Sequence, residues 1–141
     1  MTRKLPLRQS DLAALDLREF WIEQIEYTEA EEAPEEFDTP TVRLSRPSVQ
    51  QNANDKDTYL MTLRIRVSQA DVRSIDLTMR GVFHVQADDN GNEGTPRMLI
   101  YNGSAMLYGA ARGIIESITS LTGFGRLRVP SANIAELLGR R

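Results

Sequence analysis

Apolar and polar residues alternate along two neighbouring stretches in the middle of the chain. Residues 59–67 are apolar at every odd position, and residues 75–85 repeat this pattern with Gly81 as the one exception. A period of two over this length predicts strands with one buried face. Residues 68–74 form a link short enough for an antiparallel hairpin.

The first apolar stretch fits two structures. Three residues recur at the helical spacing i+4, namely Leu17, Trp21 and Ile25. Together with Tyr27, the same residues also occupy one face of a strand. The local pattern favours a helix over residues 10–28.

Turn and loop residues separate the remaining segments. Residues 29–40 are acidic and contain two prolines, which predicts a loop. Residues 41–51 have the pattern of a weak strand interrupted by Pro47. Residues 88–92, Asp-Asp-Asn-Gly-Asn, predict a turn because Asn and Gly tolerate positive φ.

The C-terminal part of the chain predicts two helices. Asn102 or Ser104 is the expected N-cap of the longer one, and Gly123 is the expected C′ stop. Its apolar face is expected to consist of Leu107, Ala111, Ile114, Ile118 and Leu121. Ser131 is expected to cap a short last helix that runs through Leu138 and is stopped by Gly139.

Two glycines interrupt the predicted longer helix. Gly109 and Gly113 each cost about 1 kcal/mol relative to alanine in a helix interior. Two glycines four residues apart suggest close approach by another backbone, but tolerated irregularity explains them equally well.

Strands followed by helices predict an α+β fold. In such a fold the helices cover one face of an antiparallel sheet. The 141 residues fit a single domain spanning 1–141.

Composition excludes several classes of protein. The net charge of −3 lacks the basic excess of a nucleic-acid binder. The absence of cysteine excludes disulfides, thiolate catalysis and cysteine-based zinc sites. The N-terminal residues lack the apolar core of a signal peptide, and no stretch reaches 18 consecutive apolar residues, so we expect a cytoplasmic protein without membrane insertion.

The residue types that carry catalysis are sparse. The only histidine, His84, falls on the polar face of a predicted strand, where a surface position is the simpler explanation. Ser104 lacks a Gly-x-Ser-x-Gly context, residues 123–125 do not complete a dinucleotide fingerprint, and no Walker lysine is present. The sequence therefore predicts no enzyme, no cofactor and no metal site.

Acidic residues are concentrated in one part of the chain. Residues 23–38 contain eight acidic residues and no lysine or arginine. A solvated loop explains such a run, and a docking surface for a basic partner explains it too.

Residues 107–138 contain several weak motifs in a fixed order. An aromatic residue precedes Ala-Arg and an isoleucine-bearing helix, then a Phe, Leu and Pro crossover leads to an Asn-containing segment and a leucine helix. This order and spacing resemble the helical end of the SecB export-chaperone family, and the matching positions are Tyr108, Ala111, Arg112, Ile115, Phe124, Leu127, Asn133, Ile134 and Leu137. Gly81-Val82-Phe83 resembles the end of the family's last strand, and the resemblance covers most of residues 17–138.

This resemblance implies a fold and a function. The SecB fold is a four-stranded antiparallel sheet with one long and one short C-terminal helix, which makes residues 17–28 a strand. The family assembles as a homotetramer, a dimer of dimers with the long helices sandwiched between sheets, which places Gly109 and Gly113 at the oligomer interface. The family's function is that of a non-enzymatic, ATP-independent holdase that binds unfolded polypeptides during protein export.

The family's client groove lies between the second strand with its crossover loop and the short helix. By position it implicates Phe37, Val42, Leu44, Ile134 and Leu138. Apolar residues at such spacing are also ordinary core residues, and both interpretations stay open.

Partner contacts depart from the family pattern. The family's basic, metal-binding tail, which contacts the SecA motor, has no counterpart in the residues before Arg141. Of the acidic docking positions, Asp76 matches, whereas Thr28 stands where an acid is expected, with Glu26 and Glu29 beside it. The partner is therefore SecA or, as for some SecB-like proteins, an antitoxin of a toxin–antitoxin system. A non-catalytic scaffold domain and a small enzyme are further alternatives.

Overall fold

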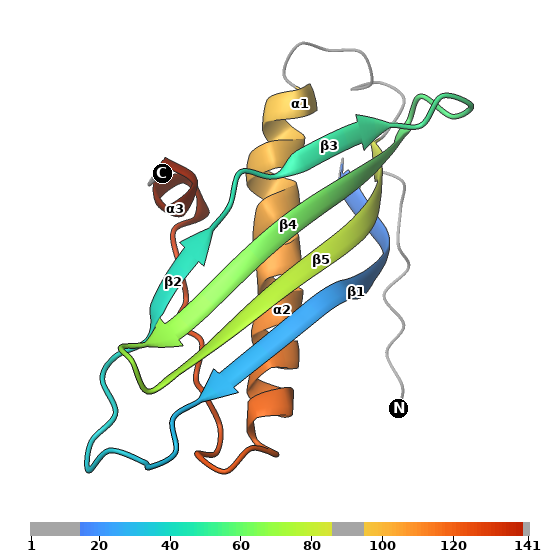
Figure 1. Cartoon of the computed structure of the whole chain (residues 1–141). Helices are drawn as coiled ribbons and strands as arrows, with labels where there is room; N and C mark the ends of the chain where they lie inside the picture. The colour runs from blue at the N-terminus through green and yellow to red at the C-terminus, as the bar shows by residue number, and fades with distance from the viewer. Residues whose placement is uncertain (1–14, 86–94, 140–141) are drawn as a thin grey trace, which may run out of the picture.

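A computed structural model describes residues 15–85 and 95–139 as a sheet with helices on one face (Figure 1). The strands are β1 (Leu15–Glu29), β2 (Thr41–Leu44), β3 (Ser48–Gln51), β4 (Thr58–Gln69) and β5 (Arg73–Val85). The helical elements are α1 (Thr95–Met98), the π-helical segment η2 (Leu99–Gly103), α2 (Ser104–Thr119) and α3 (Ile134–Gly139). The α+β class is confirmed. The turn expected at residues 88–92 lies outside the described residues.

The sheet has the strand order β1-β5-β4-β2, and β3 also pairs with β4. All pairings are antiparallel. The predicted weak strand at residues 41–51 is thus real but divided, because Pro47 lies in the gap between β2 and β3. Proline lacks the N–H that would continue the ladder to β4. The sheet is therefore four strands wide, with its fourth strand split in two.

The hairpin of β4 and β5 forms the centre of the sheet. Its strands pair from Thr58↔His84 to Gln69↔Arg73, and a three-residue turn joins them, with Ala70 at a φ of 46°. Burial alternates along both strands, as the period of two predicts. The odd-numbered residues face the helices and form most of the core.

Residues 15–29 are a strand, so the local preference for a helix is wrong there. The reason is long-range: β1 pairs with β5 along its whole length. Bulges after Leu17 and Ile22 shift the register twice. As a result Ile25 still faces the helices, whereas Trp21, opposite Arg80, lies on the outer face, which corrects the prediction that one face holds both.

The long helix begins earlier than predicted. The chain is helical from Thr95, so Asn102 and Ser104 are interior residues and not N-caps. Ser104 is fully buried, and its hydroxyl lies 4.0 Å from Met61 Sδ. A Cβ on Gly103 would approach that methionine to 3.0 Å, so glycine permits the close packing of η2 on β4.

The long helix also ends earlier than predicted. α2 ends at Thr119, and the positive φ of 77° belongs to Gly125, not to Gly123. Of the predicted apolar face, Leu107 and Ala111 are buried, Ile114 and Ile118 are half-buried, and Leu121 is exposed beyond the helix. The cap of α3 is Asn133, whose Oδ1 accepts a bond from Glu136 N at 3.1 Å, and not Ser131.

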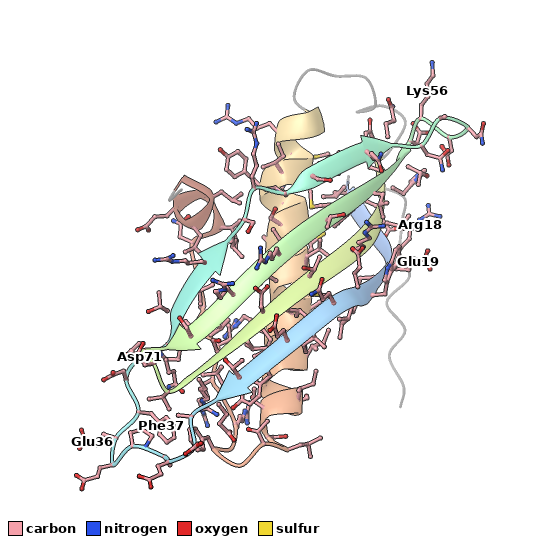
Figure 2. All side chains as sticks on the ribbon, viewed as in Figure 1. Arg18, Glu19, Glu36, Phe37, Lys56 and Asp71 are labelled. Carbon is pink, nitrogen blue, oxygen red and sulfur yellow. The ribbon has the colours of Figure 1, made fainter. Side chains whose placement is uncertain are left out.

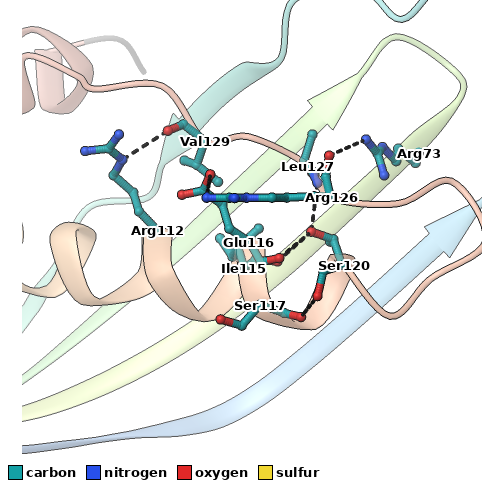
Figure 3. Close-up of polar contacts among 10 residues, drawn as sticks. Arg73, Arg112, Ile115, Glu116, Ser117, Ser120, Arg126, Leu127 and Val129 are labelled. Carbon is teal, nitrogen blue, oxygen red and sulfur yellow. Dashed lines mark hydrogen bonds and ion pairs between the residues drawn. The ribbon is translucent and has the colours of Figure 1, made fainter.

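Side chains of α2 hold the crossover, residues 125–133, against the core. Tyr108 Oη donates to Pro130 O at 2.5 Å, and Arg112 Nε donates to Val129 O at 3.0 Å. Thr119 Oγ1 donates to Ile115 O at 2.7 Å and accepts from Leu127 N at 2.9 Å (Figure 3). These bonds satisfy crossover groups that no strand pairs with.

The helix does not cover the whole sheet. α2 packs on β4 and β5, whose inner residues are buried. On β1 the helix-facing side chains Phe20, Ile22 and Ile25 are 45%, 37% and 39% exposed. We name these three residues the β1 stripe. No described strand pairs with the other edge of β1, so the β1 stripe is an apolar surface beside an open strand edge.

We predict that Thr119→Val lowers the free energy of unfolding by about 1–3 kcal/mol, because the buried Leu127 N–H loses its acceptor while the side-chain volume is nearly kept. Urea titration measures the change. Ser120→Ala is the control: it removes an exposed hydroxyl bonded to Ser117 O, with an expected change within about 0.5 kcal/mol. Equal losses in both variants would contradict this account of the crossover.

Candidate functional site

β2 presents an open backbone edge. Ser45 N donates to Arg64 O at 3.1 Å, so Ser45 and Arg64 form a hydrogen-bonded pair. Two residues earlier in β2, Arg43 is the partner of Arg66 in β4. Hydrogen-bonded and non-hydrogen-bonded pairs alternate in an antiparallel ladder. The N–H and C=O groups of Val42 and Leu44 therefore point away from β4, toward the open edge.

Two adjoining clefts lie along this edge. The first, of about 660 Å³, is lined by Thr41, Val42, Arg43, Leu44, Ser45, Arg64, Arg66 and Leu137. The second, of about 360 Å³, is lined by Pro40, Thr41, Val42, Pro130, Ser131, Ala132, Asn133, Glu136 and Leu137. They share Thr41, Val42 and Leu137, so they form one groove between β2, the crossover and α3. We call it the β2–α3 groove.

The residues predicted for client binding are divided between this groove and its surroundings. Val42 and Leu44 line it, although their side chains are 9% and 6% exposed and belong to the core as well. Ile134 is half-buried and Leu138 is buried. Both belong to α3 and pack with the core, but neither lines the clefts. Val42 and Leu44 thus line the groove and also belong to the core, and their role in client binding stays a prediction.

Phe37 lies at another end of the molecule. Its ring meets that of Phe124 edge-on at 5.9 Å, and the guanidinium of Arg73 lies 5.0 Å from its centroid. Arg73 is buried and also donates to Gln69 Oε1 and Gly125 O. In Figure 2 Phe37 lies near the β4–β5 turn, away from α3. Phe37 therefore fixes a corner of the fold and leaves 41% of its surface exposed.

Sequence reasoning missed Leu137, Arg43 and the residues around Ala132 as groove residues. Leu137 was visible as a matching position of the family pattern and as an apolar residue of the last helix. Arg43 carried no such signal, because one arginine among exposed residues is ordinary. Its importance comes from the pairing of β2 with β4, which the sequence does not specify.

The outer face of the sheet carries paired charges. Asp76 accepts a bond from Arg64 Nε at 2.9 Å and one from Arg66 Nη2 at 3.0 Å. Arg80 Nε lies 2.6 Å from Glu23 Oε2, an ion pair whose geometry is not that of a hydrogen bond. The hydrogen bond from Arg64, more than the second one from Arg66, keeps the pKa of Asp76 below its usual value, against the opposing effect of burial.

The predicted docking acids do not form one surface. Glu26 and Asp76 are partners across β1 and β5 on the outer face. Glu29 is turned to the loop that follows α2, and its Oε1 accepts bonds from Phe124 N at 2.9 Å and from Tyr27 Oη of β1 at 2.9 Å. Asp76 is bonded to two arginines, whereas neither Glu26 nor Glu29 forms an ion pair with a basic side chain of the described residues.

The predicted interface glycines lie on the surface of α2. A Cβ added to Gly109 or Gly113 meets nothing within 4 Å. Helical spacing places Met106 and Ser117 on the same side, which faces away from the sheet.

The described residues, 15–85 and 95–139, include the one histidine of the chain. His84 is half-buried on the outer face, opposite Thr58 and Asp16. In these ranges no group of three His, Cys, Asp or Glu residues has metal-site geometry. None of the helices there combines the length and apolar character needed to cross a bilayer.

Comparison with known proteins rests on structure alone, because the sequence matches no family model and no curated protein. The Mycobacterium tuberculosis SecB-like chaperone Rv1957, solved in complex with a ChAD peptide from the Rv1956 HigA1 antitoxin, is similar with a TM-score of 0.67. The match covers 84% of this chain and 91% of that one at 12% identity. The chain has a SecB-like fold. The resemblance to SecB is thereby confirmed for the fold.

A second solved structure is more distant. A Streptococcus agalactiae protein of unknown function has a TM-score of 0.47 and 8% identity, over 83% of this chain and 97% of that one. This likeness carries no argument about the site.

We predict that Asp76→Asn destabilises the protein near neutral pH and that this difference disappears in acid. The folded-state pKa of Asp76 is lowered, so its stabilising effect is present above the unfolded pKa of about 4 and is lost as the pH falls through the folded value. Urea titrations across this pH range measure it. Asp71→Asn, at the exposed β4–β5 turn, is the control, and a pH-independent difference for Asp76→Asn would refute the role of the ion pairs.

Proposed function

We propose that this protein is an ATP-independent holdase that binds unfolded polypeptides along the β2–α3 groove. The observation that carries the proposal is the open edge of β2 beside an apolar groove. An extended client adds as a strand to Val42 and Leu44 through its backbone, which requires no particular client sequence. Its alternate side chains then enter the clefts against Leu137. No catalytic step is part of this function.

Affinity at one groove is modest. Apolar contact contributes about 25 cal/mol per Å² buried, and ordering an unfolded chain opposes it. Several grooves that hold one client increase the apparent affinity without any new contact. Binding the unfolded state then draws the client away from folding and aggregation.

We propose a homotetramer as the working assembly. The β1 stripe exposes apolar side chains on an unpaired edge, which isolated proteins rarely leave open. Gly109 and Gly113 leave space on the outer side of α2 for another helix backbone to come close. One copy thus offers two surfaces, as a dimer of dimers requires.

For the partner, a dedicated client such as an antitoxin is our second candidate, ahead of delivery to SecA in export. Asp76 is bonded to two arginines and Glu29 faces the loop that follows α2, which weakens an acidic docking surface. The similar Mycobacterium protein holds an antitoxin peptide. We place the activity in the cytoplasm, where both kinds of client are made.

We predict that Leu137→Ala weakens binding of an unfolded client by about fivefold, equivalent to about 1 kcal/mol of lost apolar contact. Leu138→Ala is the matched control, because it is the next residue of α3, is buried to a similar extent and does not line the groove. Each variant costs about 2–3 kcal/mol of stability. Fluorescence anisotropy with a labelled, reduced and unfolded protein measures the affinities. Equal weakening by both variants would assign the effect to α3 stability instead of the groove.

We predict that Gly109→Ala combined with Gly113→Ala dissociates the tetramer into smaller species. Each methyl group has free space within one protomer but occupies the side where a second helix would pack. Light scattering coupled to size exclusion measures the mass. An unchanged oligomer whose stability rises by about 2 kcal/mol would instead show an ordinary exposed helix surface, because alanine is the better helix former.

A further inference from the structure

Three arginines gather where β2 pairs with β4. Arg43 and Arg66 are direct partners across the two strands, and Arg64 lies opposite Ser45, diagonal to Arg43. All three are exposed, and all three line the larger cleft. Like charges directly opposite each other destabilise a strand pair. The sheet therefore keeps a repulsive pair beside the β2–α3 groove.

The carboxylates nearby leave this group of three arginines with a net positive charge. Asp76 binds both Arg64 and Arg66, and no ion pair or hydrogen bond joins the Arg43 side chain to any described residue. The one acidic residue among those lining the groove, Glu136, lines the smaller cleft and not the larger one. The rim of the larger cleft next to Arg43 is thus positively charged, although the whole chain has a net charge of −3.

An added strand would meet this charge at one defined position. Client residues opposite Val42 and Leu44 point toward the helices and Leu137, and the client residue between them points to the outer face, beside Arg43. In an antiparallel addition the residue opposite Arg43 belongs to a non-hydrogen-bonded pair, in which side chains come closest. A carboxylate there would relieve the repulsion between Arg43 and Arg66.

We propose that the β2–α3 groove selects extended client segments in which an acidic residue lies between two apolar residues. This inference rests on the proposed function, since it names the class of client that the holdase prefers. The apolar residues supply contact inside the groove, and the acidic residue forms an ion pair with Arg43. Because this pair is exposed, its contribution is modest and falls with salt.

The test compares three labelled peptides that carry Leu-Xaa-Val in a soluble Gly-Ser frame, with Xaa as Glu, Gln or Lys. Fluorescence anisotropy at low salt measures their affinities for the full chain. We expect the Glu peptide to bind about two- to fivefold more tightly than the Gln peptide, and the Lys peptide to bind most weakly. The preference should decrease at high salt.

Two variants identify the residue responsible. Arg43→Gln should remove the preference for Glu over Gln, and Arg43→Glu should favour the Lys peptide. Arg46→Gln is the matched control: it makes the same charge change three residues away, at an exposed position that does not line the groove. Thermal unfolding of each variant checks that the fold is kept.

The outcomes separate the two proposals. If all three peptides bind equally, or if Arg46→Gln lowers the preference as much as Arg43→Gln does, the selectivity is overturned while the holdase stands. If none of the peptides binds the parent chain, strand addition at β2 is overturned together with the selectivity.

Discussion

One helix must cover a sheet that is wider than the helix. With side chains an α-helix is about 10–12 Å across, and neighbouring strands are about 4.8 Å apart, so α2 can shield roughly two strands. It shields β4 and β5, whose inner residues are buried. The strands on both sides lie at the margin of this cover, and the surfaces that can bind other chains lie there.

The two margins of the sheet differ in how far other elements cover them. On the β2 side, the crossover and α3 extend the cover, held to α2 by Tyr108, Arg112 and Thr119. This partial cover leaves a groove with apolar walls next to an open backbone edge. On the β1 side nothing described extends the cover, and the β1 stripe is exposed. A client suits the first margin and a second copy of the chain suits the second, which is why we assign holding and assembly to opposite edges.

Local pattern predicted the parts of the fold that local physics determines. The central hairpin, the break at Pro47 and the order of strands before helices follow from periodicity and proline chemistry. Local pattern did not predict the first strand, because the spacing of its apolar residues is helical. Pairing with β5 overrides that local preference. The family resemblance supplied this correction. The bulges that turn Trp21 outward, and the cross-strand meeting of Arg43 with Arg66, depend on register between distant segments and could not be read from the residues alone.

The most direct test of the holdase is suppression of aggregation of a chemically unfolded model protein without ATP, with the particle mass read by light scattering in the same sample. The account predicts suppression at near-stoichiometric amounts of a tetramer, with the client held in the same particle. A stable tetramer that leaves aggregation unchanged would contradict general holding. It would direct attention to a single dedicated client or to a scaffold role.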